Sequence, residues 1–237
     1  MTITGQHNPR LKEIRKLRMR RRWRERKGLF VAEGEDLLAA ADEAGWDAVE
    51  RYVAAGSDLE GVEVEPGLLA SASGIASGTR ALAVYRERWA PSATGPLCLY
   101  LHAVHDPGNV GAVLRAAEAF GAATVALGPG CADPFGPKAV RASMGAVFGV
   151  SLAKVGAISE LPGTKVALVP HQGPELRELQ ASPETTLLVG SEREGLPQEV
   201  TKEADLTAHI PIRSNSLNAA MAATVALYEL AHTMHKR

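Results

Sequence analysis

The sequence has only two cysteines and no long apolar run, and each absence excludes a class of protein. Cys98 and Cys131 cannot build a disulfide framework, and neither has zinc-ligand spacing around it. The longest apolar stretch, residues 217–231, is interrupted by polar side chains and is too short to span a bilayer. The first residues are not followed by the apolar core that a secretion signal requires. We therefore expect a cytoplasmic protein with reduced thiols and no membrane partner.

Familiar catalytic signatures are also missing. The chain has no G-x-G-x-x-G after a predicted strand, no G-x-x-x-x-G-K-[ST], no G-x-S-x-G and no H-E-x-x-H. These absences argue against dinucleotide oxidoreductases, P-loop NTPases, serine hydrolases and zinc proteases. His102 and His105 lie beside Asp106, but two side chains three residues apart at a strand end point to opposite faces. We therefore predict no metal site there.

Positive charge is concentrated at the amino terminus. Residues 1–28 hold eleven Lys and Arg against two acids, although the whole chain carries a net charge of −1. Such a block favours a nucleic acid over the alternative, a solvated helix without a partner, and Trp23 offers a ring for base stacking. The apolar stripe of Leu11, Ile14 and Leu17 is too narrow to favour a membrane surface and is better explained by docking on the protein's own body. The candidate nucleic-acid-binding residues are Arg10, Lys12, Arg15, Arg18, Arg21, Arg22 and Trp23.

The pattern of apolar residues predicts a folded chain in two parts. With 46% apolar and 22% charged residues, the composition is that of an ordinary globular protein. Residues 1–90 are predicted to form a small α/β domain, and residues 89–96, with two prolines and a glycine, are the expected linker. The expected elements of this domain are a helix from Asn8-Pro9 through the basic block to Gly28, strands over 29–32, 49–54 and 82–85, and a helix over 35–44.

Residues 96–237 alternate between strand and helix, which predicts a mostly parallel sheet covered by helices. A continuous apolar run such as residues 97–104 is typical of a buried parallel strand. The other expected strands cover 124–127, 165–169, 186–189 and 208–212, and the expected helices cover 110–120 and 217 to about 235. The predicted fold class is therefore α/β.

Three loops at the expected carboxyl ends of strands are rich in glycine and short polar residues. Ligands collect at this edge of a parallel sheet, so the loops form the candidate site. The plain alternative for each is a capped turn that leads into a helix, and Asn109 can cap the helix after the first loop. The last helix has three candidate caps in Ser214, Asn215 and Ser216, which leaves Asn218 unexplained. The loops are residues 105–111, 190–197 and 210–218.

Taken together, the loops resemble the three motifs of the SpoU (TrmH-like) RNA ribose 2′-O-methyltransferases, within the SPOUT superfamily. The resemblance covers residues 97–237, and the third motif departs from many relatives in its shorter segment between Ile210 and Ser216. The basic segment and the run from Phe30 to Gly34 are similar to the substrate-binding domain that precedes many rRNA-directed members. The matching positions are residues 106–121 with Asn109 and Arg115, residues 188–192 with Gly195-Leu196, and residues 210–212 and 216–218, which lead into Tyr228-Glu229.

The resemblance implies a fold, a cofactor and an assembly. The implied fold is a SPOUT-type parallel sheet with a C-terminal trefoil knot, preceded by the small α/β substrate-binding domain. The implied cofactor is S-adenosylmethionine, held by the backbone around Gly190, Ile210 and Leu217. The implied assembly is an obligate homodimer whose active site draws on both subunits. The implied catalytic residues are Asn109, Arg115, Glu192, Ser216 and Asn218.

The implied reaction is methylation of a ribose 2′-hydroxyl, and ribosomal RNA is favoured because the amino-terminal domain resembles that of rRNA-directed members. A tRNA methylase of the same chemistry is the nearest alternative. A non-catalytic RNA-binding or ribosome-assembly factor is a further alternative, but it would have no need to retain all five catalytic residues. The basic amino terminus argues against a small-molecule methyltransferase.

Arg115 is expected to stabilise charge and to orient a phosphate through its planar fork. Descriptions of the family often give this arginine the role of base, but a guanidinium has a pKa above about 12 and loses its proton only at great cost. We predict that the proton passes to a phosphate oxygen or to water. Short polar side chains such as Asn109 and Ser216 suit alignment of the nucleophile, and Glu192 is expected to orient Asn109 or the loop amides.

Overall fold

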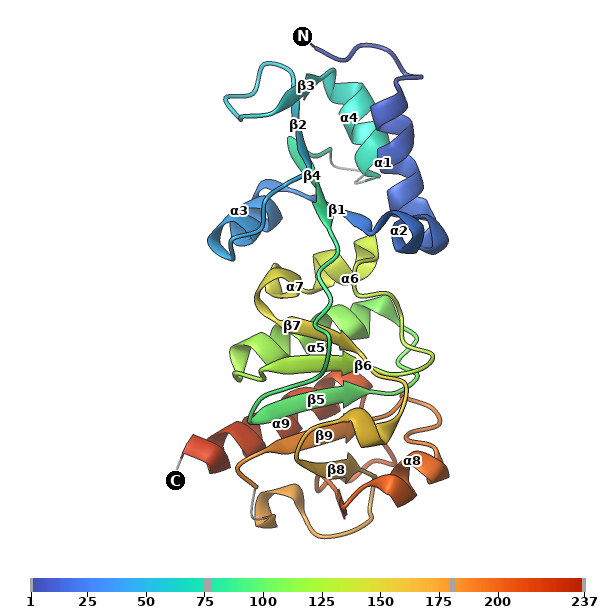
Figure 1. Ribbon diagram of the computed structural model, residues 1–237, viewed down its shortest axis with the longest axis vertical. Coiled ribbons are helices and arrows are strands. Elements are labelled where there is room, and N and C mark those ends of the chain that lie inside the picture. Colours follow the sequence, from blue (N-terminus) through green and yellow to red (C-terminus); the bar gives the residue numbers. More distant parts are fainter. Residues whose placement is uncertain (1, 75–77, 180–181, 236–237) are drawn as a thin grey trace. The chain divides into compact units, whose positions relative to one another are not determined.

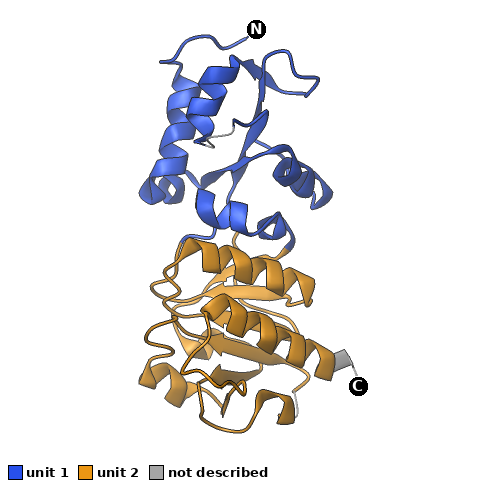
Figure 2. Cartoon of the chain, turned by 180° about the vertical axis from the view of Figure 1, so that it is seen from behind, with its two compact units in different colours: residues 1–87, 133–149 blue, residues 88–132, 150–237 orange. Residues whose placement is uncertain are grey.

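The computed structural model describes residues 2–74, 78–179 and 182–235, and the chain divides into two units (Figure 2). Unit 1 consists of Met1–Glu87 and Asp133–Gly149, and unit 2 consists of Arg88–Ala132 and Val150–Arg237. The sequence pattern places one division near residue 90. In the structure, residues 133–149 also group with unit 1, although the strands on either side of them belong to unit 2.

The basic amino-terminal segment forms two helices, so the single helix expected from Asn8-Pro9 to Gly28 is wrong. Extended backbone at Arg20, with φ −127° and ψ 104°, separates α1 (Pro9–Met19) from α2 (Arg21–Lys27). This break leaves carbonyl groups at the end of α1 without helical partners. The Arg24 guanidinium satisfies two of them, because its Nη1 donates to the carbonyls of Leu17 (2.6 Å) and Arg18 (3.2 Å).

A four-stranded sheet forms the body of unit 1, in the order β1-β4-β2-β3 (Figure 1). β4 pairs antiparallel with β1 and β2, and β2 pairs parallel with β3. The sequence pattern predicts β1, β2, β4 and α3, and it misses β3 and α4. The bounds are β1 (Leu29–Glu33), α3 (Glu35–Glu43), β2 (Glu50–Ala54), β3 (Val62–Val64), α4 (Pro66–Ser73) and β4 (Ala81–Arg86).

The apolar stripe of α1 belongs to the core of unit 1. Leu11, Ile14 and Leu17 are fully buried against strand residues such as Val31 and Leu82. Burial of three large aliphatic side chains supplies several kcal/mol, at about 1.5–3 kcal/mol each. The expected docking of the stripe on the protein's own body is therefore confirmed.

Residues 133–149 cover the opposite face of the same sheet. They contain α6 (Pro137–Ala142) and α7 (Ala146–Gly149), neither of which the sequence pattern predicts. The rings of Phe135 and Phe148 lie 4.7 Å and 6.0 Å from the ring of Phe30 in β1. Trp46 donates its indole N–H to the carbonyl of Phe148 at 2.9 Å. This aromatic cluster explains why the segment groups with unit 1.

Unit 2 contains a six-stranded parallel sheet in the order β10-β8-β9-β5-β6-β7, which confirms the predicted α/β class. The expected strand over residues 208–212 is wrong, because β10 ends at Ala208 and Pro211 has no N–H for a ladder. The strand β7 and the helix α8 were not expected. The bounds are β5 (Leu97–Leu101), α5 (Pro107–Ala119), β6 (Thr124–Leu127), β7 (Ser151–Lys154), β8 (Thr164–Leu168), β9 (Thr185–Val189), α8 (Gln198–Glu203), β10 (Leu206–Ala208) and α9 (Ala219–His235).

Helices cover both faces of this sheet. Figures 1 and 2 show α5 and α9 side by side on one face. On the other face, Cys98 and Tyr100 of β5 pack with Ile158 and with Val200 of α8. Coverage on both sides explains why β5, β6 and β9 are buried at every residue, as the continuous apolar run over residues 97–104 predicts for β5.

Candidate active site

The predicted loops meet at the carboxyl edge of the unit 2 sheet. From β5 the chain first adds strands on one side, β6 and β7, and then adds β8, β9 and β10 on the other side. The order therefore reverses between the neighbours β5 and β9, and ligands of parallel sheets bind at such a switch point. The loops after β5 and β9 leave the sheet side by side there, as the sequence pattern predicts.

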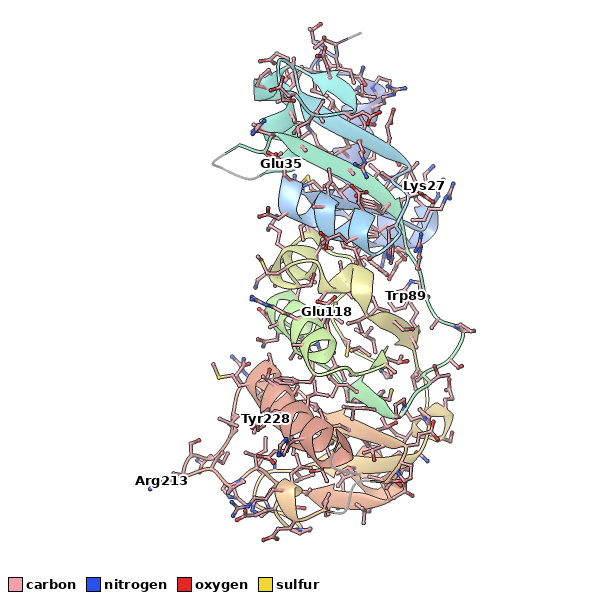
Figure 3. The ribbon with its side chains drawn as sticks, turned by 90° about the vertical axis from the view of Figure 1, so that its left-hand side faces the viewer. Lys27, Glu35, Trp89, Glu118, Arg213 and Tyr228 are labelled. Atoms are coloured by element: carbon pink, nitrogen blue, oxygen red, sulfur yellow. The ribbon has the colours of Figure 1, made fainter. Side chains whose placement is uncertain are left out.

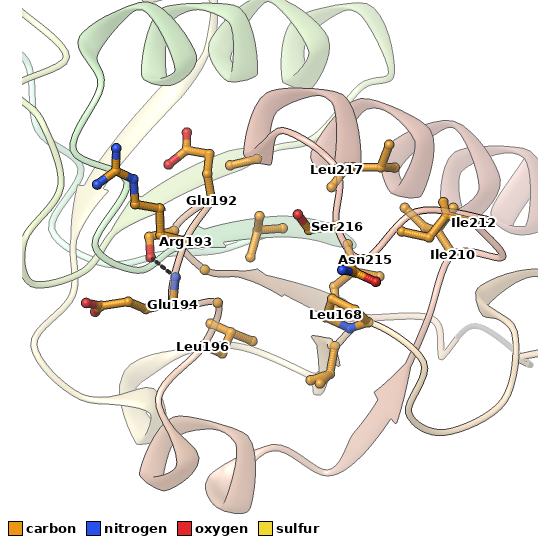
Figure 4. A pocket seen from close by; sticks show the side chains of 18 of the residues that line it. Leu168, Glu192, Arg193, Glu194, Leu196, Ile210, Ile212, Asn215, Ser216 and Leu217 are labelled. Atoms are coloured by element: carbon orange, nitrogen blue, oxygen red, sulfur yellow. Dashed lines mark hydrogen bonds between the residues drawn. The ribbon is translucent and has the colours of Figure 1, made fainter.

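A pocket of about 450 Å³ opens at this edge, within the usual range for small-molecule sites (Figure 4). All three predicted cofactor-binding residues, Gly190, Ile210 and Leu217, line it, and so do Glu192 and Ser216. The sequence analysis missed the contribution of the loop after β8, although β8 ends at the same edge of the sheet. The lining residues from that loop and strand are Leu168, Val169, Pro170 and Gln172.

Gly190 allows the loop after β9 to fold tightly against itself. A Cβ at this position would lie 2.1 Å from the carbonyl carbon of Gly195 and 2.3 Å from the nitrogen of Leu196. Gly195 itself has a φ of 67°, and its N–H donates to the carbonyl of Ser191 at 3.0 Å. The closed turn requires glycine at position 190, and its residues line the pocket.

Asp106, and not Asn109, caps the helix after the first loop. The carboxylate of Asp106 accepts hydrogen bonds from the backbone N–H groups of Gly108 (2.6 Å) and Asn109 (3.2 Å). The capping alternative for Asn109 is therefore wrong, and the amide of Asn109 is available for contacts with the other loops.

The side chains of Asn218, Asn109 and Glu192 form a hydrogen-bonded relay across the three loops. The Nδ2 of Asn218 donates to the Oδ1 of Asn109 at 3.1 Å, and the Nδ2 of Asn109 donates to the Oε1 of Glu192. The Oδ1 of Asn218 accepts from the backbone N–H groups of Ala220 (3.0 Å) and Met221 (3.2 Å). Asn218 is thus the cap of α9, in place of the three residues proposed from the sequence.

The direction of the relay is fixed at both ends. Backbone N–H groups at the start of α9 can only donate, and an ionised carboxylate can only accept. Both amides are therefore held in one orientation, with Asn109 between the pocket loop and the last helix. This places three of the five predicted catalytic residues in one network, with Ser216 in the lining of the adjacent pocket.

Arg115 is not part of this network. It is an exposed residue of α5, and no hydrogen bond or ion pair joins its side chain to any residue in the described part of the chain. It follows Asn109 by six positions, which rotates it by about 120° around the helix and moves it about 9 Å along the axis. One copy of the chain therefore does not bring Arg115 together with the relay.

Two further polar side chains, those of Tyr100 and His102, lie at the carboxyl end of β5 near the switch point. The hydroxyl of Tyr100 lies 3.0 Å from Nδ1 of His102, and burial raises the pKa of Tyr100 to about 12 and lowers that of His102. At neutral pH the pair is therefore uncharged. Over the described ranges there is no cluster of three or more His, Cys, Asp and Glu that could hold a metal ion. The same ranges include no helix long and apolar enough to cross a membrane.

The predicted nucleic-acid-binding residues differ in the exposure of their side chains and in their contacts within the chain. Arg10 pairs with Glu50 at 3.1 Å and Arg21 with Glu25 at 2.8 Å, but both arginines stay exposed. Arg15 is half-buried, and its Nη1 donates to the carbonyl of Gln6 at 3.3 Å. The side chains of Lys12 and Arg22 are exposed as well.

Arg18 and Trp23 make several contacts inside unit 1. Arg18 pairs with the buried Glu33 and donates to the carbonyl of Ala72 at 2.8 Å. The indole N–H of Trp23 donates to Glu13 at 2.8 Å, and its ring packs against the core. The ring is also covered by the cations of Lys16, Arg26 and Lys27, the first 4.6 Å from the ring centroid. These contacts occupy part of the ring surface that base stacking would use.

Two family sequence models match the chain. That of the SpoU rRNA Methylase family matches residues 96–228, and that of the MRM3-like substrate binding domain matches residues 8–88. Over 146 residues the chain is 33% identical to the 23S rRNA (guanosine(2553)-2′-O)-methyltransferase RlmP of Bacillus subtilis. This alignment covers 58% of this chain and 59% of that protein. It is 34% identical over 138 residues to the 23S rRNA (uridine(2479)-2′-O)-methyltransferase of Streptomyces viridochromogenes, covering 52% and 48%. The chain thus matches about half the length of these relatives.

The fold is similar over nearly its full length to a solved structure. An AdoMet-bound rRNA methyltransferase from Sinorhizobium meliloti aligns with a TM-score of 0.88 at 28% identity, covering 98% of this chain and 97% of that one. Both units thus have counterparts in known proteins, and the parallel sheet is of the type seen in these methyltransferases.

Proposed function

The chain belongs to the SpoU rRNA Methylase family, and from this we propose that it transfers a methyl group from S-adenosylmethionine to a ribose 2′-hydroxyl of ribosomal RNA. The relay of Asn218, Asn109 and Glu192 beside a glycine-shaped pocket is the observation that carries the proposal. Relatives named as 23S rRNA 2′-O-methyltransferases support the choice of ribosomal RNA over tRNA. With that substrate, the proposed location of the protein is the cytoplasm.

The residues of the pocket fit S-adenosylmethionine. The closed turn at Gly190 presents backbone groups, Ile210 and Leu217 add apolar surface, and the carboxylates of Glu192 and Glu194 lie in the lining. A pocket with apolar walls and a few polar groups suits an adenine ring, a ribose and a charged sulfonium. When bound, the cofactor supplies an electrophilic methyl group on a positively charged sulfur.

The chain's own residues align the nucleophile and stabilise its charge. The fixed amide of Asn109 and the hydroxyl of Ser216 orient the ribose, because the relay leaves Asn109 no alternative conformation. Arg115 stabilises the negative charge that develops on the 2′-oxygen and binds the neighbouring phosphate. The proton leaves to a phosphate oxygen or to water, and Glu192 acts by orienting Asn109.

We infer that the active unit is a homodimer in which Arg115 of the partner subunit completes each site. Met221, Val225 and Tyr228 are exposed and recur on one face of α9, which packs against the helix that carries Arg115. Figure 3 shows Tyr228 on α9 and Glu118 on α5. An apolar stripe of this kind favours a self-complementary interface. The carboxyl-terminal part is also proposed to form the trefoil knot of SPOUT folds.

Mixing two inactive variants tests the shared site. An equimolar, re-equilibrated mixture of Arg115→Ala and Asn218→Ala chains is expected to recover about one quarter of wild-type activity, because half of the dimers are mixed and each has one intact site. The measurement is methyl transfer before and after subunit exchange. If the mixture stays as inactive as its components while mixed dimers form, Arg115 does not act across the dimer.

The role of Arg115 is tested by a conservative substitution. Arg115→Lys is expected to retain measurable activity at a rate about 10–100-fold lower, because lysine keeps the charge and loses the bidentate fork. The rate at saturating RNA and cofactor is the measurement. Complete loss of activity with unchanged RNA affinity would show that the guanidinium has a role that charge alone cannot fill.

RNA binding by the basic segment predicts a changed salt dependence. Deleting residues 1–28 would remove the buried stripe of α1, so charge substitutions are the sharper test. The double variant Lys12→Gln/Arg22→Gln is expected to weaken RNA binding and to lower the slope of log K against log salt by about 0.7–0.9 for each phosphate that the variant no longer neutralises. The variant Arg177→Gln/Lys202→Gln in unit 2 is the control. An identical slope in the two double variants would contradict RNA binding by the basic segment.

The proposed function itself is tested by transfer of labelled methyl from S-adenosylmethionine to unmodified rRNA and, separately, to tRNA. We expect label at a ribose in rRNA and none with Arg115→Ala. Label in tRNA alone would favour the tRNA methylase of the same chemistry. Tight RNA binding without label in either RNA would favour a non-catalytic ribosome-assembly factor.

A further inference from the structure

Residues 133–149 lie inside the part of the sequence that matches the methylase family, yet they are built into unit 1. Two ion pairs join this segment to the rest of the unit, in addition to the aromatic cluster described above. Asp133, at its start, pairs with Arg24 of α2 at 2.7 Å, and both side chains are nearly buried. Arg141 of α6 pairs with Glu33 of β1 at 3.3 Å.

Glu33 lies between two arginines that come from distant parts of the sequence. Its carboxylate is 2% exposed and pairs with both Arg18 and Arg141. Arg18 is 15% exposed and Arg141 is 44% exposed, so only the second guanidinium reaches solvent to a large extent. One carboxylate cannot neutralise two guanidinium groups. The remaining positive charge is therefore exposed to solvent at Arg141.

This charge lies beside the basic helices of unit 1. Because Arg18 and Arg141 share one carboxylate, the end of α1 and the end of α6 are neighbours. The start of α6 adjoins α2, since the guanidinium of Arg24 lies 3.5 Å from the position of a Cβ on Gly136. Arg141 is thus an exposed cation on a helix that adjoins both basic helices, and α2 carries the further exposed cations Arg22 and Arg26.

We propose that Arg141, held in place by Glu33, is a phosphate-binding residue of the RNA surface of unit 1. The inference rests on the proposed function and adds that the RNA-binding unit is assembled from two separate stretches of sequence, residues 8–88 and 133–149. A guanidinium fixed by a buried carboxylate loses little conformational freedom when it binds a phosphate. Its planar fork also suits two oxygens of one phosphate group.

The test is RNA binding by Arg141→Gln as a function of salt concentration. We expect an affinity about tenfold lower, and a slope of log K against log salt that is lower by about 0.7–0.9, since glutamine neutralises no phosphate. The affinity for S-adenosylmethionine should be unchanged. Arg177→Gln is the matched control, because Arg177 is also an exposed arginine that pairs with a glutamate, but in unit 2. Equal affinities and slopes for the two variants would overturn the proposal.

A second variant separates an effect on RNA binding from an effect on folding. Arg141→Gln leaves the buried Glu33 with one partner fewer, whereas Glu33→Gln/Arg141→Gln removes both charges. The double variant should show the same decrease in slope, and a wild-type slope in a folded double variant would overturn the proposal. Glu33→Gln alone should lower the affinity for RNA and leave the slope of log K against log salt unchanged. The charge of Arg141 remains in this variant, but its guanidinium is no longer held in place. Failure of the wild-type chain to bind rRNA at all would instead refute the proposed function.

Discussion

Gly190→Ala is expected to weaken S-adenosylmethionine binding by at least a hundredfold, or about 2.7 kcal/mol. The added methyl group would lie 2.1–2.3 Å from three backbone atoms of Gly195 and Leu196, where no side-chain rotation can relieve the overlap. The turn after β9 would have to open, and with it the pocket wall that Gly190, Glu192 and Leu196 form. Because the overlap is with backbone, the loss is expected to exceed that of any single side-chain deletion in the lining.

Calorimetric titration of S-adenosylmethionine into the purified protein measures this effect. Gly5→Ala is the control, since a Cβ at Gly5 meets nothing within 4 Å. The circular dichroism and melting temperature of the Gly190→Ala variant establish that the sheet remains folded. Wild-type affinity in a folded Gly190→Ala variant would show that the cofactor binds elsewhere than in the pocket of unit 2.

The sequence predicts the second half of the chain better than the first, and burial explains why. The strands β5, β6 and β9 are covered on both faces, so each is mostly apolar and stands out from its surroundings, although β6 and β9 begin with threonine. In unit 1, β3 has three residues and α4 is a short run of apolar and small residues. Neither is long enough for a periodic pattern to emerge, and both are stabilised by packing against α1 and β2.

The sequence pattern predicts that the three loops of the candidate site lie at one edge of the sheet, but it does not assign the helix caps. Each helix that leaves the candidate site is preceded by several residues with a side-chain oxygen, and any of them can cap a helix start. The choice of Asp106 over Asn109 follows from where the backbone turns, which composition does not specify. The same holds for Asn218, which caps α9 and also donates to Asn109.

The placement of residues 133–149 depends on contacts between distant parts of the sequence. Phe135 and Phe148 are ordinary apolar residues in their local context. Their packing on Phe30 joins positions more than a hundred residues apart, and periodicity along the chain carries no information about such pairs. The ion pair of Arg18 could not be predicted for the same reason, because its partner Glu33 lies in a later strand.

The second large effect is expected at the carboxylate end of the relay. Glu192→Ala should lower kcat about 100–1000-fold, the usual loss when one preorganised hydrogen-bonding group is removed from an active site. Without the acceptor, the Asn109 amide can rotate, and it no longer holds the ribose in line. Glu192→Gln should recover most of this activity, because the Oε1 of glutamine still accepts from the Nδ2 of Asn109. Glu199→Ala, at an exposed position in α8, is the control.

The same series separates an orienting carboxylate from a base. A general base at Glu192 requires glutamine to be as inactive as alanine, since an amide takes up no proton at neutral pH. At the other end of the relay, Asn218→Asp keeps the acceptor that caps α9 but loses the donor to Asn109. This variant should therefore fold with wild-type stability and still lose most of its kcat. Activity of Asn218→Asp near the wild-type level would show that orientation of Asn109 does not limit methyl transfer, and the role assigned to the relay would then be wrong.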